Sequence, residues 1–362
     1  MSKAAPEAPA GVVRPRSAGT PATGAGEDSA PASEEFRQAR PERPCARKAW
    51  PEGPRMLLAW GALLVFALVW LGADFAFGQA TLVATYAIAG LGVVVIVGQA
   101  GQIVLGQGAF VALGAYAQAL LVQAGMAPLA ALPFAILAGA SGGALASLPA
   151  GRLGGLYFGM STLAFALIVE EALVRWESLT HGAAGLVLPA FGVAGSTADT
   201  PAAQAALSIA ALLAVLALCA RLLRSRLGRA WRAVREDEAA AAACGIAPGT
   251  AKLRAFAVGG GLSGLAGGLY AHWIGFISPE QFGLMFSFEL LMLAFIGGAR
   301  HLSGAAWGAL VVVAIPQLIA VLRDALPGDW ARSAGLELVL FGAVVVGVVL
   351  LRPQGLAGGG RG

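Results

Sequence analysis

Between Phe75 and Gly151 the chain carries no Asp, Glu, Lys or Arg over 77 residues. A helix needs about 20 mostly apolar residues to cross a bilayer, so this stretch can hold about three spans. Only 12% of the 362 residues are charged, whereas soluble domains carry about 25%. An outer-membrane barrel would show alternating apolar segments of about ten residues, and the sequence has no such pattern. These features predict an all-α polytopic membrane protein.

Ten apolar segments have a length and composition that fit membrane spans. The segment 107–123 is rich in small residues, so a partial crossing is an alternative there, and two re-entrant segments would leave eight spans. Small residues let helix backbones approach closely in lipid, and segments such as VGGGLSGLAGGLYA (258–271) therefore predict tight packing. The ten predicted spans are 56–73, 80–98, 107–123, 128–149, 154–175, 203–223, 253–275, 284–299, 304–322 and 335–351.

Residues outside these spans predict the domain boundaries and the orientation. Residues 1–55 hold 16 of the 44 charged residues and few large apolar ones, which predicts a disordered tail that is neither a secretory signal nor a mitochondrial presequence. The membrane domain is placed at 56–352 and a short second tail at 353–362. Basic residues gather on the cytoplasmic side of membrane proteins, which predicts cytoplasmic termini and a cytoplasmic polar segment. The basic residues that flank spans on this side are Arg43, Arg47, Lys48, Arg55, Arg152, Arg300 and Arg352.

The polar segment 225–253 interrupts the apolar sequence. We expect it to form one helix ended by Gly245, with Pro248 and Gly249 turning the chain. Leu227, Trp231, Val234, Glu238, Ala241 and Ala242 would share one side, and Arg226, Arg229 and Arg232 would lie mostly on the other. Arg232 with Glu236, and Arg235 with Glu238, have the spacing of helix-stabilising pairs. Such a helix can dock into a soluble partner or lie on anionic headgroups, and the residues alone favour neither.

A few polar side chains within the spans are candidates for the lining of a translocation path. Gln99, Gln102 and Gln107 could hydrogen-bond a zwitterionic solute without a buried charge, and Thr162 and Glu289 are further candidates. A carboxylate at mid-bilayer costs about 2.5–3.5 kcal/mol on insertion scales, so Glu289 should face protein or water. The alternative for the three glutamines and for Glu289 is hydrogen bonding between helices.

Two other classes of protein were considered. Gly139, Ser141 and Gly142 form a GxSG pattern like that of rhomboid intramembrane proteases, and His272 could supply the base for such a serine. Small-residue packing is the alternative explanation for both segments. A proton-coupled carrier would need paired charges in mid-span, and the uncharged stretch 75–151 opposes it. Cys45, Cys219 and Cys244 have no metal-ligand or redox spacing.

Several motifs together resemble the LivM-type permeases of branched-chain amino acid ABC importers. The segment EDEAAAAACGIAP (236–248) is similar to the loop with which such permeases dock an ATPase, although Gly245 lies seven residues after Glu238 where six is common. VGQAGQIVLGQGAFVALGAYAQALL (97–121), RLGGLYFGMSTLAFALI (152–168), KLRAFAVGGGLSGLAGGLYA (252–271) and GGARHLSGAAWGA (297–309) match in order. THGAAGL (180–186) is similar too, but His181 stands where the family usually has a second Gly. The resemblance covers roughly 56–357.

The resemblance implies a function and a set of partners. It implies an ABC importer permease fold whose coupling loop, 224–252, carries Arg232, Arg235, Glu236, Asp237, Glu238, Ala239, Ala240 and Gly245 as ATPase-coupling residues. The implied partners are two ABC ATPase subunits, a second and non-identical permease, a periplasmic binding protein and the lipid bilayer of the inner membrane. The implied substrate is a branched-chain or related amino acid, with urea or an amide as the alternative; no metal, cofactor or nucleic acid is implied.

One further observation supports a division of labour between subunits. The sequence has no Gly-Lys dipeptide, so it lacks the phosphate-binding loop of the P-loop ATPases. We therefore expect a transport subunit that is not itself an enzyme and depends on an ATPase supplied by another chain.

Overall fold

The computed structural model describes residues 73–151, 155–189, 191–193, 196–197 and 200–325, with 342, 346–347 and 355–357 near the C-terminus. The predicted tail 1–55 lies outside these residues. So do nearly all of the predicted spans 56–73 and 335–351.

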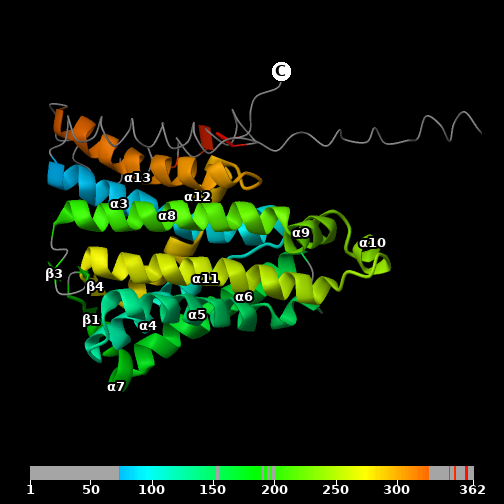
Figure 1. The fold of residues 1–362 in the computed structure, drawn as a ribbon, viewed down its shortest axis with the longest axis horizontal. Helices are drawn as coiled ribbons and strands as arrows, with labels where there is room; N and C mark the ends of the chain where they lie inside the picture. Colours follow the sequence, from blue (N-terminus) through cyan, green and yellow to red (C-terminus); the bar gives the residue numbers. More distant parts are fainter. Residues whose placement is uncertain are drawn as a thin grey trace, which may run out of the picture. The chain divides into compact units, whose positions relative to one another are not determined.

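Long helices make up most of the described chain (Figure 1), and the predicted all-α class is confirmed. The long helices are α3 (Ala73–Val93), α4 (Gln107–Gln123), α5 (Pro128–Ala146), α6 (Gly155–Arg175), α8 (Pro201–Arg224), α11 (Pro248–Ile274), α12 (Leu284–Gly297) and α13 (Leu302–Ala325). Each coincides with one of the predicted spans. Within the described residues, five helical stretches are long and apolar enough to cross a membrane: 75–99, 128–146, 155–175, 201–224 and 279–297.

Short elements connect these helices. They are the π-helix η1 (Val94–Gln99), the α-helices α7 (Glu177–Thr180), α9 (Arg226–Glu236) and α10 (Glu238–Ala243), and the 3-10 helices η2 (Leu148–Gly151), η3 (Gly182–Ala184) and η4 (Pro279–Phe282). Strand β1 (Leu186–Val187) pairs antiparallel with β4 (Phe276–Ile277), with Leu186 opposite Ile277. Strand β2 (Gly192–Val193) pairs antiparallel with β3 (Ser196–Thr197). Figure 1 shows α9 and α10 at one end of the long helices, and β1, β4 and α7 at the other.

Helix α11 lies at the centre of the packing, against α3, α4 and α5. A Cβ atom added to Gly114 of α4, to Gly139 of α5 or to Gly264 of α11 would overlap backbone atoms of a facing helix. Apolar helices gain no hydrophobic free energy by leaving lipid for one another, so this close approach is a main source of their attraction. The tight small-residue packing expected from the sequence is therefore present.

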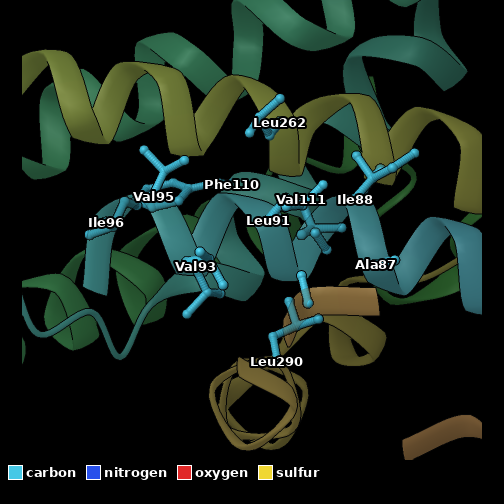
Figure 2. Close-up of a cluster of buried hydrophobic side chains, with 14 of the residues drawn as sticks. Ala87, Ile88, Leu91, Val93, Val95, Ile96, Phe110, Val111, Leu262 and Leu290 are labelled. Atoms are coloured by element: carbon cyan, nitrogen blue, oxygen red, sulfur yellow. The ribbon is translucent and has the colours of Figure 1, made fainter. Parts of the chain in front are cut away.

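Larger apolar side chains fill the space between α3 and its neighbours. Figure 2 shows side chains of α3 between α11 on one side and α12 on the other, with Phe110 and Val111 contributed by α4. Ile88, Leu91 and Leu290 are fully buried there. This core holds α3 in place up to the point where it continues into η1.

The chain between η1 and α4 is not helical. The Gln107 side-chain amide, at the start of α4, donates to the Ser263 hydroxyl of α11 at 2.5 Å. Ser263 is the sixteenth residue of α11, which at 1.5 Å per residue places it about 22 Å from the start of that helix. Helix α4 thus begins level with the middle of α11, and residues 100–106 carry the chain to that depth without helical structure.

Ion pairs and turns occupy the strand end of the molecule. Arg175 pairs with Glu171, as their i, i+4 spacing leads one to expect. The Thr180 hydroxyl accepts from the Gly182 amide at 3.2 Å and donates to the Trp176 carbonyl at 2.8 Å. Next to Thr180, His181 has φ 57° and is the one described residue other than glycine with a positive φ. Glycine adopts this left-handed conformation without the steric cost of a Cβ atom.

Replacing His181 with glycine should therefore stabilise the protein. Left-handed backbone costs a residue with a Cβ atom about 1–2 kcal/mol, and the greater freedom of glycine in the unfolded chain offsets part of this gain. We expect His181→Gly to raise the apparent melting temperature of the detergent-solubilised protein by a few degrees. His181→Ala should leave it unchanged or lower, and a glycine variant no more stable than the alanine variant would contradict a strained position.

Candidate functional site

The polar segment forms a projection between α8 and α11. The Ser225 hydroxyl, at the start of α9, accepts from the Leu227 amide at 3.2 Å and donates to the Leu222 carbonyl at 2.6 Å. This double contact turns the chain sharply out of α8. A Cβ atom at Gly228 would overlap the backbone of Leu223, so glycine is what permits α9 to fold back so closely.

The expectation of one continuous helix in this segment is wrong. Asp237 is extended, with φ −159° and ψ 116°, and its carboxylate accepts from the amides of Ala239 at 2.8 Å and Ala240 at 3.0 Å. An Asp side chain that binds two free amides at a helix start is a strong N-cap, and its charge suits the positive end of the helix. The chain therefore ends α9 and starts α10 at this residue. Gly245, with φ 81°, ends α10 as expected.

The break also changes the ion pairs that the spacing predicted. Instead of pairing with Arg235, Glu238 pairs with Lys252 at 2.7 Å. Arg235 lies 3.7 Å from Glu236, the carboxylate that was expected to pair with Arg232. Lys252 is 3% exposed whereas Glu238 is 48% exposed, so this pair joins the surface of α10 to the interior at the start of α11.

Two further contacts fix the base of the projection. Trp231 is fully buried, and its indole N–H donates to the Ala251 carbonyl of α11 at 3.0 Å. The Arg235 guanidinium donates to the Gly98 carbonyl of η1 at 2.6 Å. Trp231, Arg235 and Glu238 thus connect α9 and α10 to two different membrane helices.

The outer surface of the projection consists of small and charged residues. Most of α10 is exposed, and Ala241 is its buried residue. Among the predicted coupling residues the exposed ones are Arg232, Glu236, Asp237, Glu238, Ala239, Ala240 and Gly245. Arg235 is directed inward instead. Trp231 and Lys252 were not among the predicted coupling residues, although Lys252 stands out in the sequence as the only lysine after residue 48.

The polar side chains proposed for a translocation path are mostly held in internal hydrogen bonds. Gln99 donates to the Arg300 carbonyl at 3.1 Å, and Gln102 to the Ala100 carbonyl at 3.3 Å. The Thr162 hydroxyl accepts from the Leu105 amide at 3.0 Å and donates to the Gly159 carbonyl at 2.7 Å. The bonds of Gln99, of Thr162 with Leu105 and of Gln107 with Ser263 join separate segments, whereas the bond of Gln102 is local.

Glu289 and the oxygen of Gln107 remain available for other contacts. Glu289, on α12, is half-buried and within hydrogen-bonding reach of the Tyr86 hydroxyl on α3. The side-chain oxygen of Gln107 is buried without a hydrogen-bond partner. A role for these residues in a path stays a prediction.

The structure does not assemble the residues of a serine protease. The Ser141 hydroxyl is exposed on α5 and donates to the Ala138 carbonyl of its own helix at 2.8 Å. Both ring nitrogens of His272 are engaged elsewhere, one with Gln118 and one with the Pro189 carbonyl, each at 3.0 Å. Gly139 packs against Gly260 and Gly264 of α11, so the GxSG pattern serves helix packing. In the described part of the chain, no three His, Cys, Asp or Glu side chains lie close enough together to hold a metal ion.

Replacing Asp237 tests whether its side chain caps α10. Loss of an N-cap costs about 1 kcal/mol, roughly a fivefold change in local opening. We expect Asp237→Ala to speed amide hydrogen exchange in residues 238–245 about fivefold, while Asp237→Asn, which keeps the accepting oxygen, should stay near wild type. Equal exchange in the alanine variant and the wild type would show that α10 does not depend on this cap.

Comparisons with known proteins confirm the resemblance to LivM-type permeases. A sequence model of the family described as "Branched-chain amino acid transport system / permease component" matches residues 75–349. The high-affinity branched-chain amino acid transport system permease protein LivM of Salmonella typhimurium is 34% identical over 229 residues, which are 57% of this chain and 51% of that protein. The LivM protein of Escherichia coli is 35% identical over 136 residues, 38% of this chain and 29% of that protein.

A second permease type is also similar. The LivH protein of Salmonella typhimurium is 27% identical over 204 residues, 54% of this chain and 63% of that protein. The chain spans about half, or less, of the length of the LivM proteins that it matches. No solved structure gives a significant match.

Proposed function

Because this chain belongs to the family of permease components of branched-chain amino acid transport systems, we propose that it is the membrane subunit of an ABC importer driven by ATP hydrolysis on separate subunits. The observation that carries this proposal is the projection formed by α9 and α10. It presents small side chains outward on α10, and three side chains anchor it to the membrane helices.

The projection has the properties of a lever that another protein moves. Small residues such as Ala239 and Ala240 let a groove in a partner close around α10. A displacement of α10 would pass to α11 through the pair of Glu238 with Lys252. It would pass to η1 through α9 and the bond from Arg235 to Gly98. A free surface loop would need none of these anchors.

The charge of the projection also favours a protein partner over a lipid surface. Arg226, Arg229 and Arg232 are exposed on α9 and could meet anionic headgroups. The tip, however, exposes three consecutive carboxylates from Glu236 to Glu238. Anionic headgroups would repel these acids, whereas a groove on an ATPase subunit can pair them with basic residues.

The proposed assembly follows from the family and the orientation argument. The projection, Arg300 and both termini would face the cytoplasm of a bacterium, because basic residues gather on that side of the inner membrane. Two ATPases would bind there, a second and non-identical permease would complete the path, and a periplasmic binding protein would deliver the substrate to the other end. Gln99, Gln102, Gln107, Thr162 and Glu289 are the proposed polar contacts along the path.

The proposed substrate is a branched-chain amino acid or a close relative. The similar proteins LivM and LivH are named for branched-chain amino acid transport, and this supports the same class here. Uptake assays with leucine, isoleucine and valine test it, and urea or an amide as the transported solute would redirect the proposal within the same importer mechanism.

A bulky substitution at the tip should remove the ATPase from the complex. Ala240→Trp enlarges the side chain that a closing groove must surround. We therefore expect this variant to lower the yield of co-purified ATPase at least tenfold in a mild-detergent pull-down from native membranes. Ala127 is exposed between α4 and α5 at the other end, and Ala127→Trp is the matched control. Equal recovery of ATPase with both variants would exclude docking at α10.

Reversing the charge of Glu238 should uncouple α10 from α11 and so weaken ATP-driven uptake. Glu238→Lys places two cations where the wild type has a 2.7 Å ion pair, so α10 should lose its attachment to α11 and ATP-driven uptake should fall at least fivefold while the protein stays inserted. The double variant Glu238→Lys with Lys252→Glu restores opposite charges and should recover part of the uptake. Wild-type uptake in the single variant would refute the coupling role of this pair.

A further inference from the structure

Residues 100–106 place non-helical backbone inside the membrane domain. The segment starts beside the Gly298–Arg300 turn, where Gln99 donates to the Arg300 carbonyl, and ends at Gln107, level with the middle of α11. Irregular backbone at membrane depth is tolerated only where it is buried in protein or lines a water-filled cavity, because lipid cannot satisfy its N–H and C=O groups. The surroundings of this segment therefore reveal what its open side must face.

The segment has one buried side and one open side. Gln102 and Val104 are buried, at 6% and 1% exposed, whereas Gly101 and Ile103 are exposed, Ile103 at 38%. Buried and exposed residues therefore alternate along this part of the segment. The Leu105 amide is satisfied by Thr162, so the segment is held against α6 along its buried side. The Ile103 side chain also touches α6, because a Cβ atom at Gly159 would lie 3.0 Å from its Cγ2 atom, but part of Ile103 and Gly101 remains exposed.

The start of the segment is tied to the projection. The Arg235 guanidinium binds the Gly98 carbonyl at 2.6 Å, and a Cβ atom at Gly101 would overlap the Arg235 side chain. Gly101 has φ 69°, so glycine meets both the left-handed backbone and the close approach. Arg235 is 22% exposed, so water reaches the guanidinium beside this backbone.

The helix that leads into the segment is of an unusual type. Residues Val94–Gln99 form a π-helix, which contains one residue more per hydrogen-bonded turn than an α-helix and occurs mostly as single turns at functional sites. The Ala100 amide completes this pattern by donating to the Val95 carbonyl at 3.2 Å. A turn of this kind can tighten to an α-helical one with a change in the position of the residues that follow.

We propose that residues 100–106 form a wall of the water-filled path for the zwitterionic substrate, and that Arg235 couples the position of this wall to α9. This inference rests on the proposed function and extends it to the moving part of the path. When an ATPase displaces α9, the guanidinium carries the Gly98 carbonyl with it, and the non-helical residues 100–106 change their exposure to the path. Ile103 is the large apolar side chain on the open side. Its exposure to the path therefore changes each time α9 moves.

Cysteine accessibility tests the position of the wall. A methanethiosulfonate is attacked at its sulfur by the cysteine thiolate, which forms in water and not in lipid. In a background with Cys45→Ser, Cys219→Ala and Cys244→Ser, we expect Ile103→Cys to react with a small water-soluble methanethiosulfonate at least ten times faster than Leu137→Cys. Leu137 is 63% exposed on the continuous helix α5, where no irregular backbone requires water, so it serves as the control. Reaction of Ile103→Cys as slow as that of the control would overturn the proposal.

The same variant tests the coupling of the wall to ATP. In the purified complex, trapping the ATPase with vanadate should change the reaction rate of Ile103→Cys at least threefold and leave that of Leu137→Cys unaltered. A fast rate that does not respond to trapping would refute the moving wall. The comparison of the two cysteines in membranes needs no ATPase, so it can fail while the ATPase still co-purifies, and the proposed function would then survive without this inference.

Arg235 is the positioning residue of the proposal and has its own test. The side chain in the Arg235→Gln variant is too short to reach the Gly98 carbonyl from α9. We therefore expect ATP hydrolysis to persist while uptake per ATP hydrolysed falls at least tenfold. Arg235→Lys should recover part of the uptake per ATP hydrolysed. Arg226→Gln, an exposed arginine on the same helix, should keep the wild-type ratio. A purely structural role of Arg235 would lower hydrolysis and uptake together and leave the ratio intact, and that result would refute the coupling.

Discussion

Close backbone contact around α11 is the interaction on which the rest of this structure depends. In lipid the helices gain little from hydrophobic burial, so dispersion contacts between backbones must hold them together. Gly114, Gly139 and Gly264 permit these contacts because any larger residue would overlap the facing helix. The result is a rigid group of four helices, α3, α4, α5 and α11. This rigidity matters because a force applied at the projection must move the helices without being absorbed by local deformation.

The projection of α9 and α10 is built on that group at two points. Lys252, at the start of α11, holds Glu238 of α10, and Gly98 of η1 holds Arg235 of α9. One anchor therefore leads into the rigid helix and the other into the least regular part of the described chain. A displacement of the projection would therefore reach α11 through Glu238 and would reach η1 through Arg235. The first contact would move the rigid group, and the second would move the non-helical segment that follows η1.

Much of the fold could be predicted from the sequence because lipid imposes simple rules on helix length and polarity. The spans 128–149, 203–223 and 253–275 agree with α5, α8 and α11 to within a few residues at each end. The break at Asp237 was missed because five alanines after Glu238 favour a helix, and the capping strength of Asp237 appears only when two free amides converge on it. Helix propensity alone favours one continuous helix through this segment. It does not account for the cap that Asp237 forms when the helix is broken at that residue.

The site was harder to predict than the fold, since its contacts join residues far apart in the sequence. Arg235 lies 137 positions from Gly98, and Gln107 lies 156 from Ser263. Spacing along one helix suggested that Arg235 would pair with Glu238, whereas the tertiary structure offers it a carbonyl at the end of η1. The sequence left two alternatives for the polar residues in the spans, the lining of a path or hydrogen bonds between helices, and the partners in those bonds could be found only in the structure.

The central claim is that an ATPase subunit docks on α10, and a cross-link from that helix tests it most directly. Cys244 is exposed at the end of α10 and can carry a photoreactive group. Cys219 is buried, and Cys45→Ser removes the cysteine of the N-terminal 55 residues, so the group attaches at Cys244. Illumination of native membranes should attach the chain to a nucleotide-binding ATPase, with a yield that changes when ATP is added. Cross-links to lipid alone, in membranes that contain the assembled complex, would contradict the account.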